Sequence, residues 1–206
     1  SPSATPINLD NAAAVPTTSV GNLQAVTLWR VTAAGVLAAT NTLPTSSVVF
    51  PTAISVDRNG SSIVGIIGTE RGSAGFIVNT DKAGLFGKLL QIGLSSTTAD
   101  AVVRHTDGSF TVAGSSSETL VGKKVAGVTD GVLIKISKAS KITSVVRSSA
   151  VKGKRIWNSA TSTLLLGGEV VAGGKTETAI TKFTTSFAPT WTYRFASTGP
   201  AITVGS

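Results

Sequence analysis

Basic side chains form the one cluster in this sequence that suggests a chemical role. From residue 123 to residue 155 there are nine of them against a single acidic residue, Asp130, giving a formal charge of +8. The rest of the chain holds nine basic and nine acidic residues and is neutral. A surface with such an excess of positive charge attracts polyanions. The nine residues are Lys123, Lys124, Lys135, Lys138, Lys141, Arg147, Lys152, Lys154 and Arg155.

Known catalytic and nucleotide-binding motifs are missing. The sequence Gly173-Gly174-Lys175-Thr176 imitates the end of a phosphate-binding loop, but Glu169 stands where the motif needs its first glycine. His105 is the only histidine, and no Gly-x-Ser-x-Gly motif accompanies it. Because the chain has no cysteine, thiolate metal sites and disulfides are excluded. We therefore expect no metal or cofactor.

Two further groups of side chains leave alternatives open. A glycosidase or polysaccharide lyase would need two carboxylates gathered by the fold about 5–10 Å apart, and the candidates are Glu70, Asp100, Glu118 and Glu169. Trp191, Tyr193 and Phe195 alternate along one predicted strand and so share one face. They could stack on sugar rings, but packing against a neighbouring sheet is the favoured interpretation.

The elements that must position these side chains are β-strands. Val, Ile, Leu, Ala, Ser and Thr dominate the chain, only 14% of residues are charged, and 22 glycines are spread throughout. This composition is typical of half-buried strands joined by tight turns. The uncharged stretch 31–56 contains Pro44 and Pro51, so no continuous apolar segment long enough to span a membrane exists.

Four segments of the chain align without gaps, and their starts are 49, 56 and 47 residues apart. Each is followed by a turn and a second extended run, and two more strand-like runs precede each of the last three. Asn59-Gly60 and Asp107-Gly108 are strong hairpin signals within this pattern. The aligned segments are AVTLWRVTAAG from Ala25, AGFIVNTDKAG from Ala74, DGVLIKISKAS from Asp130 and ETAITKFTTSF from Glu177.

A four-stranded antiparallel unit with a period near 50 residues predicts an all-β fold, a β-propeller of about four blades or a fragment of a larger propeller. A single such sheet cannot cover both of its apolar faces, and stacking the sheets about an axis solves this problem. A β-sandwich is the alternative fold, but its strands need no internal similarity.

The segments DGSFTVAG from Asp107 and DGVLIKI from Asp130 resemble the repeats of bacterial β-propeller proteins, including the seven-bladed-type and delta-60-like repeats of exported proteins. The resemblance covers most of residues 24–206 and is clearest in the third unit. It implies the propeller fold and carries no activity with it.

The two ends of the chain complete the predicted organisation. Residues 1–23 form an N-terminal tether, and residues 24–206 form the propeller repeat domain. Residues 7–15 could supply a strand missing from the first unit, and residues 200–206 read as one more first strand that closes the ring. A cut from a longer propeller is an equal alternative.

The predicted ligand site lies where connections of the third unit meet. Lys123 and Lys124 fall between its second and third strands, and Lys152, Lys154 and Arg155 fall in the connection that follows its fourth strand. In a propeller these connections lie on the same side, so the five cations form the candidate site for an anionic polymer. Lys138 and Lys141 should lie on the opposite side.

We therefore predict a non-enzymatic binding or structural module at the cell surface of a bacterium or outside it. Its partners would be an acidic polysaccharide, a wall polymer or a protein, with self-association as a further option. Nucleic acid is excluded, because single-strand binders interleave aromatic residues with the basic groove. The carbohydrate-active enzyme remains the alternative.

Overall fold

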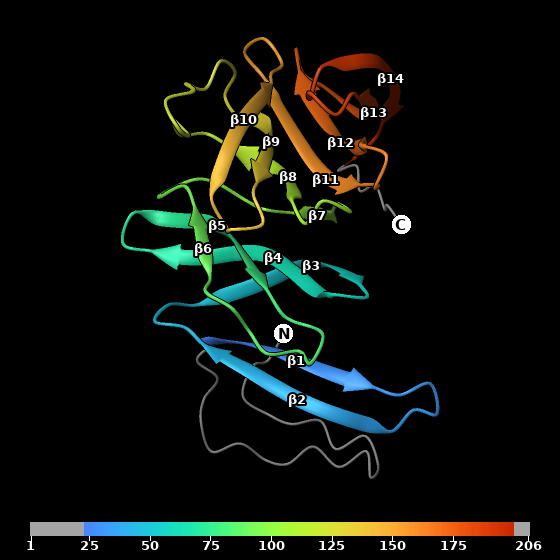
Figure 1. The fold of residues 1–206 in the computed structure, drawn as a ribbon. Helices are drawn as coiled ribbons and strands as arrows, with labels where there is room; N and C mark the ends of the chain where they lie inside the picture. The colour runs from blue at the N-terminus through green and yellow to red at the C-terminus, as the bar shows by residue number, and fades with distance from the viewer. Residues whose placement is uncertain (1–22, 200–206) are drawn as a thin grey trace.

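The computed structural model describes residues 23–199, which form fourteen β-strands in four antiparallel sheets and contain no helix (Figure 1). A hairpin comes first, and three four-stranded sheets follow it in chain order. The hairpin is β1 (Ala25–Val31) and β2 (Leu37–Pro44). The first sheet is β3 (Val49–Asp57), β4 (Gly60–Thr69), β5 (Gly72–Asn79) and β6 (Leu90–Ile92). The second sheet is β7 (Ala101–Arg104), β8 (Phe110–Ser116), β9 (Asp130–Ile136) and β10 (Ile142–Ser148), and the third is β11 (Lys154–Ala160), β12 (Leu165–Ala172), β13 (Lys175–Phe183) and β14 (Pro189–Ser197).

The predicted all-β fold of four-stranded sheets is confirmed. In each complete sheet the strands pair with their neighbours in sequence, as expected for hairpins joined in series. The sheets stack one upon another from the hairpin to the third sheet (Figure 1), an arrangement compatible with part of a β-propeller. The first unit contributes only β1 and β2 to the described part of the chain. The strands predicted at residues 7–15 and 200–206 lie outside the described residues.

Connections within the sheets alternate between two sides of the stack. The side with the first-to-second and third-to-fourth strand connections is here called the turn rim, and the opposite side the loop rim. Six turn-rim connections share one geometry, in which the first residue's N–H donates to the fifth residue's carbonyl and the fourth residue's N–H donates back to the first. The turns are 32–36, 81–85, 105–109, 137–141, 161–165 and 184–188.

The fourth residue of each of these turns has a positive φ, which favours glycine. Gly35, Gly84 and Gly108 meet this need. Leu164 and Phe187 occupy the same position in the third sheet with φ values of 59° and 65°. Both side chains are buried against the second sheet, so the packing they gain offsets the backbone strain.

Glycine also allows the first strand of each sheet to cross closely over the second. A Cβ added at Gly65, Gly114 or Gly168 would lie only 1.9–2.1 Å from a carbonyl oxygen, which belongs to the preceding strand at Gly65 and Gly168 and to Thr98, just before β7, at Gly114. In the first and third sheets this crossing lies beside a β-bulge, at Pro51/Ala53 and at Trp157/Ser159. The bulges increase the local twist and let the sheets stack at an angle.

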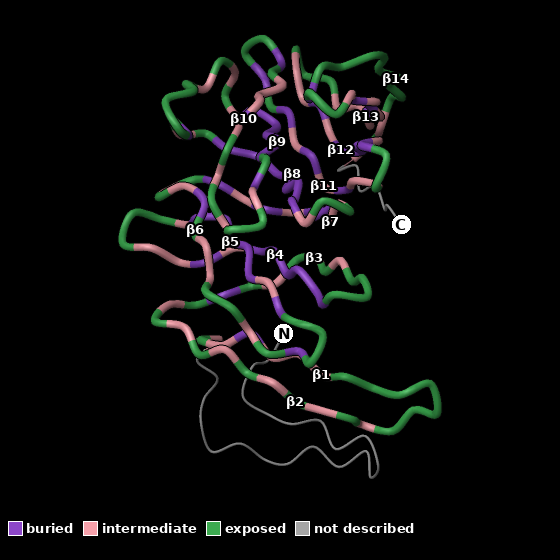
Figure 2. Tube along the Cα trace, viewed as in Figure 1, coloured by how far each residue is buried: buried purple, intermediate pink, exposed green. Residues whose placement is uncertain are grey.

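Buried aliphatic residues lie between successive sheets, as the purple segments in the middle of Figure 2 show. Val64, Ile77 and Ile92 of the first sheet pack against Val112 and Ile134 of the second. Leu133 of the second sheet packs against Leu166 and Trp157 of the third, and Trp157 meets the Phe183 ring edge-on at 5.6 Å. The first and second sheets therefore use both faces for the core, which explains the short runs of consecutive buried residues in β5, β8 and β9.

Candidate functional site

Two loops of the second sheet come together on the loop rim. The loop 117–129 joins β8 to β9, and the loop 149–153 leads from β10 to β11. The N–H of Val128 donates to the carbonyl of Gly153 at 2.8 Å, and the N–H of Arg155 donates to the carbonyl of Thr129 at 2.8 Å. These bonds bring together the strand ends and loops that carry Lys123, Lys124, Lys152 and Lys154, whose side chains are all exposed.

The carboxylate of Glu118 is held by the neighbouring loop 93–97. It accepts hydrogen bonds from the backbone N–H groups of Leu94, Ser95 and Ser96 and from the Thr97 hydroxyl, the last at 2.6 Å. Partial burial would raise the pKa of Glu118, but these hydrogen bonds to the charged form lower it to about 2. Glu118 is therefore ionised at neutral pH, and its charge faces backbone donors.

An ion pair beneath loop 117–129 fixes the loop's shape. Asp130 is fully buried and accepts hydrogen bonds from the N–H groups of Ala126 and Gly127 at 2.9 Å. The guanidinium of Arg147 lies 3.4 Å from the Asp130 carboxylate and donates to the carbonyls of Lys123, Ser116 and Glu118. The Asp130 carboxylate and the Arg147 guanidinium both stabilise the conformation of the loop, and neither is exposed where a ligand could bind.

Arg155 does not join the exposed cations, which corrects the predicted five-residue site. Its side chain is only 5% exposed, donates to the Thr181 hydroxyl at 2.9 Å and lies 4.0 Å above the Trp157 ring. Burial lowers its pKa to about 10, so it remains protonated at neutral pH. Arg155 and Trp157 lie two residues apart on one strand and therefore point to the same face, toward the second sheet.

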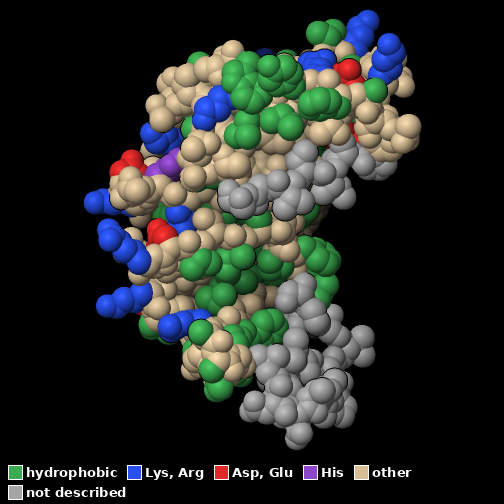
Figure 3. Space-filling view, turned by 90° about the vertical axis from the view of Figure 1, so that its right-hand side faces the viewer, with side chains coloured by type: hydrophobic (Ala, Val, Ile, Leu, Met, Phe, Trp, Pro, Cys, Tyr) green, Lys and Arg blue, Asp and Glu red, His purple; other side chains and the backbone are tan. Residues whose placement is uncertain are grey.

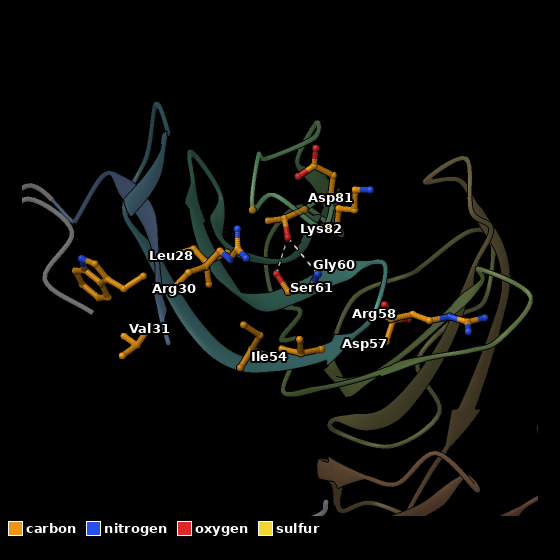
Figure 4. A pocket seen from close by; sticks show the side chains of 14 residues that line it. Leu28, Arg30, Val31, Ile54, Asp57, Arg58, Gly60, Ser61, Asp81 and Lys82 are labelled. Carbon is orange, nitrogen blue, oxygen red and sulfur yellow. Dashed lines mark hydrogen bonds between the residues drawn. The ribbon is translucent and has the colours of Figure 1, made fainter. Parts of the chain in front are cut away.

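A groove that the sequence did not reveal lies between the hairpin and the first sheet. Its volume is about 410 Å³. Leu28 and Arg30 of β1 point into it, Ile54 of β3 forms the facing wall, and Arg58 points away (Figure 4). The Arg30 guanidinium crosses toward the 81–85 turn and donates to the carbonyl of Ala83 at 3.1 Å.

The groove lies where the β1–β2 hairpin meets β3, β4 and the 81–85 turn of the first sheet. A hydrogen bond between Ser61 and Thr80, with oxygens 2.7 Å apart, lies within its lining (Figure 4). The lining combines apolar side chains with a mixed set of charges, and Asp57 is already paired with Arg104 at 3.0 Å. This mixed charge gives the groove no clear preference for one class of ligand.

Cations also line the turn rim. Figure 3 shows Lys and Arg side chains in a row along one edge of the view, across successive sheets. Lys138 and Lys141 lie in the 137–141 turn on this rim, as the sequence predicted. The basic segment 123–155 is therefore divided between opposite sides of the stack. Exposed cations in or beside the turns are Arg58, Lys82, Lys135, Lys138 and Lys141.

Two of the four candidate catalytic carboxylates, Asp100 and Glu118, lie against the same segment, because the consecutive residues Thr98 and Thr97 donate hydrogen bonds to them, whereas Glu70 and Glu169 belong to the first and third sheets. Glu70 lies in the β4–β5 turn, Glu118 is held by loop 93–97, and Glu169 lies within β12. Asp100 precedes β7 and accepts a hydrogen bond from the Thr98 hydroxyl at 2.5 Å. Burial raises its pKa. Within residues 23–199, no group of three or more His, Asp or Glu side chains could hold a metal ion.

The aromatic row lies on the outer strand of the last sheet. Trp191, Tyr193 and Phe195 of β14 are 44%, 63% and 55% exposed. The rings of Trp191 and Tyr193 lie 5.2 Å apart and are inclined by 57°. Rings inclined in this way form no flat platform on which consecutive sugar units could stack.

Comparison with known proteins supplies no relative. No protein-family model matches the chain, and no curated protein sequence matches it significantly. In the described part of the chain, no helix has the length and apolar character needed to cross a lipid bilayer.

Proposed function

We propose that this chain is part of a non-enzymatic β-propeller that binds an anionic polymer, such as an acidic polysaccharide, outside the cell or at its surface. The proposed ligand-binding residues are Lys123, Lys124, Lys152 and Lys154. The observation that carries the proposal is the hydrogen bonding between loops 117–129 and 149–153, which gathers these four lysines on one rim.

The electrostatics of the two loops support this assignment. The carboxylates nearest to Lys123 and Lys124 in sequence are Glu118 and Asp130, and both face donors within the protein. The lysine ammonium groups stand in solvent, where a flexible polyanion can approach without a large desolvation cost. Binding of this kind depends on the number of cations in contact and weakens strongly with salt.

Loop geometry adds a second line of support. The Asp130–Arg147 pair and the Glu118 contacts hold the backbone of loop 117–129 before any ligand arrives. Lys123 therefore sits on a restrained backbone, and only its own side chain must be ordered on binding. Preorganisation of this type reduces the entropy lost on association.

The test is retention on a heparin column eluted with a salt gradient. A variant with Lys123, Lys124, Lys152 and Lys154 replaced by Ser should elute at much lower salt than the wild-type protein. The matched control replaces Lys82, Lys135, Lys138 and Lys141 by Ser, which removes the same charge from the turn rim. This control should retain most of the wild-type elution position.

Two outcomes would contradict the proposal. Equal shifts of both variants would show that net charge alone controls retention, and unchanged elution of the loop variant would exclude the loop site. Turnover of an acidic polysaccharide by the purified protein, lost on Glu70→Gln or Asp100→Asn substitution, would instead support the carbohydrate-active enzyme.

A further inference from the structure

A cavity of about 250 Å³ lies on the turn rim where the second and third sheets meet. The second sheet contributes the 105–109 turn and Lys135 near the end of β9. The third sheet contributes Leu164 and Phe187 from its two turns. Both sheets are complete, so the cavity is separate from the groove beside the hairpin and from the lysines of the loop rim.

Leu164 and Phe187 form an apolar wall of this cavity. Both side chains are buried and belong to the cluster that joins the second and third sheets. The same positions in the turns of the second sheet hold the small residues Gly108 and Ser140. Bulky side chains at a positive φ cost backbone strain, and such strain is often found where a ligand binds. The turns of the third sheet therefore place apolar surface beside the polar groups of the second.

Polar groups that line the same cavity keep hydrogen-bonding atoms that the protein does not use. Asp107 accepts from the N–H and the hydroxyl of Ser109 at 2.8 and 2.7 Å, both through Oδ1. Its Oδ2 has no hydrogen-bond partner in the described part of the chain. His105 contacts the Thr111 hydroxyl through Nε2 at 2.7 Å, and its Nδ1 likewise has no partner among the described residues. Lys135 adds an exposed ammonium group.

The charges that line the cavity cancel. Asp107 and Lys135 carry opposite charges, and burial lowers the pKa of His105, so the imidazole is neutral at pH 7. A carboxylate only accepts hydrogen bonds, an ammonium only donates them, and a neutral imidazole can do either. A ligand that fits must be neutral and must donate and accept at neighbouring points. Hydroxyl groups on a ring meet both conditions.

We propose that the cavity between the second and third sheets binds one neutral sugar ring. Hydroxyl groups of the ring donate to Asp107 Oδ2 and accept from Lys135 Nζ, and a further hydroxyl bonds to His105 Nδ1. The C–H face of the ring packs on Leu164 and Phe187. Pockets for drug-sized ligands enclose roughly 300–1,000 Å³, so a cavity of about 250 Å³ fits a ligand of one ring.

The sole histidine supplies the measurement. Because the chain has one histidine, its imidazole gives a single Hε1 signal in a proton NMR spectrum that reports on the cavity. The protein is titrated at neutral pH with D-glucose, D-galactose, D-mannose and N-acetyl-D-glucosamine, and at least one should shift the signal to saturation. The methyl glycosides of that sugar distinguish the source. Binding of a glycoside indicates the end of a glycan, and binding of the free sugar alone indicates a monosaccharide.

Two substitutions test the assigned contacts. Lys135→Met keeps the aliphatic stem and removes the ammonium, so the affinity for the sugar should fall roughly tenfold. Asp107→Asn keeps an oxygen for the Ser109 bonds and replaces the second oxygen by a donor, with a similar expected loss. The matched control, Lys141→Met, removes an exposed ammonium from the same rim outside the cavity and should bind as wild type. Far-UV circular dichroism establishes that each variant is folded.

Four results would overturn the proposal. They are no saturable shift with any of the four sugars, an affinity that Lys135→Met and Asp107→Asn leave unchanged, an equal loss in Lys141→Met, and tighter binding of glycine. The ammonium and carboxylate of glycine would pair with Asp107 and Lys135 and leave the other polar groups of the cavity unused. The variant that lacks the four loop-rim lysines should bind the sugar as wild type, so this test and the heparin test can fail independently.

Discussion

Two interfaces in this molecule use equivalent positions and reach different degrees of closure. Between the second and third sheets, Gly131 receives the Trp157 ring, since a Cβ added at Gly131 would lie 2.6 Å from the indole nitrogen. Between the hairpin and the first sheet, Val26 and Pro51 occupy the equivalent positions, and although Val26 is buried, an open groove lies beside them. Pairing registers identify the equivalence, because Val26 faces Leu43 as Gly131 faces Ser148.

The two interfaces differ in the number of strands that pack against the facing sheet. In the second sheet, β7 and β8 pack against β11 and contribute Ala101 and Ala113 to the buried cluster around Trp157. Among residues 23–199, the hairpin consists only of β1 and β2, and Ile54 on the facing strand is 51% exposed. The contacts between successive sheets run mainly through their first strands, β3, β7 and β11, whose apolar side chains exclude water from the interface.

Removing Trp157 is the largest expected perturbation of the closed interface. Trp157→Ala deletes a fully buried ring that contacts both Phe183 and Arg155. We expect a loss of about 3–5 kcal/mol in the free energy of unfolding, measured by urea denaturation. Trp29→Ala, on the less buried hairpin, should cost less than half as much. Equal losses would mean that the two interfaces are equally closed in solution.

Adding a methyl group at Gly131 tests the same interface by overpacking. Gly131→Ala forces the buried Trp157 ring to move, and the expected loss of stability is about 1–3 kcal/mol. Gly199→Ala is the control, because nothing lies within 4 Å of its added Cβ. A stability equal to wild type for Gly131→Ala would show that the indole has free space to retreat.

The hydrogen bonds to Glu118 make the stability of the folded protein depend on pH. Its pKa is lowered from 4.5 to about 2 in the folded protein, so its contribution to stability is complete above about pH 4.5 and is lost as pH falls toward 2. Glu118→Gln should lower stability at pH 7 by about 1 kcal/mol and flatten this acid dependence. Hydrogen exchange at Leu94–Ser96 reports it, and an unchanged acid profile in the variant would exclude Glu118 as its source.

Ile54 in the groove should give the smallest effect. Ile54→Ala removes a half-exposed side chain, and the expected loss is below about 1 kcal/mol in urea denaturation. A loss of 2 kcal/mol or more would show that the groove is filled in solution. The variant thus measures how open this interface is.

Much of this fold was predictable from the spacing of similar segments. The aligned starts at Ala74, Asp130 and Glu177 fall at or near the third strand of each complete sheet. Their apolar fourth positions lie on the face that covers the next sheet, because alternation along a strand fixes the face once one residue is placed. The groove was not predictable, since it arises where β1 and β2 lack inner partners among the described residues.

The candidate site was predicted in part. The predicted strand order correctly placed the two loops that carry Lys123 and Lys152 on the same rim. The burial of Arg155 depends on β11 beginning at Lys154 and on Trp157 filling the space below it. Side chains alternate along a strand, so the two-residue spacing of Arg155 and Trp157 indicated that both point to the same buried face. The run Lys152–Arg155 was instead interpreted as a solvent-exposed loop.

The repeated turn of the turn rim has a consequence for how this architecture can diversify. Six turns there share one five-residue hydrogen-bonding pattern, from which the two-residue β3–β4 connection departs, whereas loop-rim connections range from the two residues between β4 and β5 to the thirteen between β8 and β9. Insertions on the loop rim leave strand register and sheet spacing intact. New specificities can therefore be acquired there by changes in loop length, while the opposite side stays constant as the template that sets the angle between units.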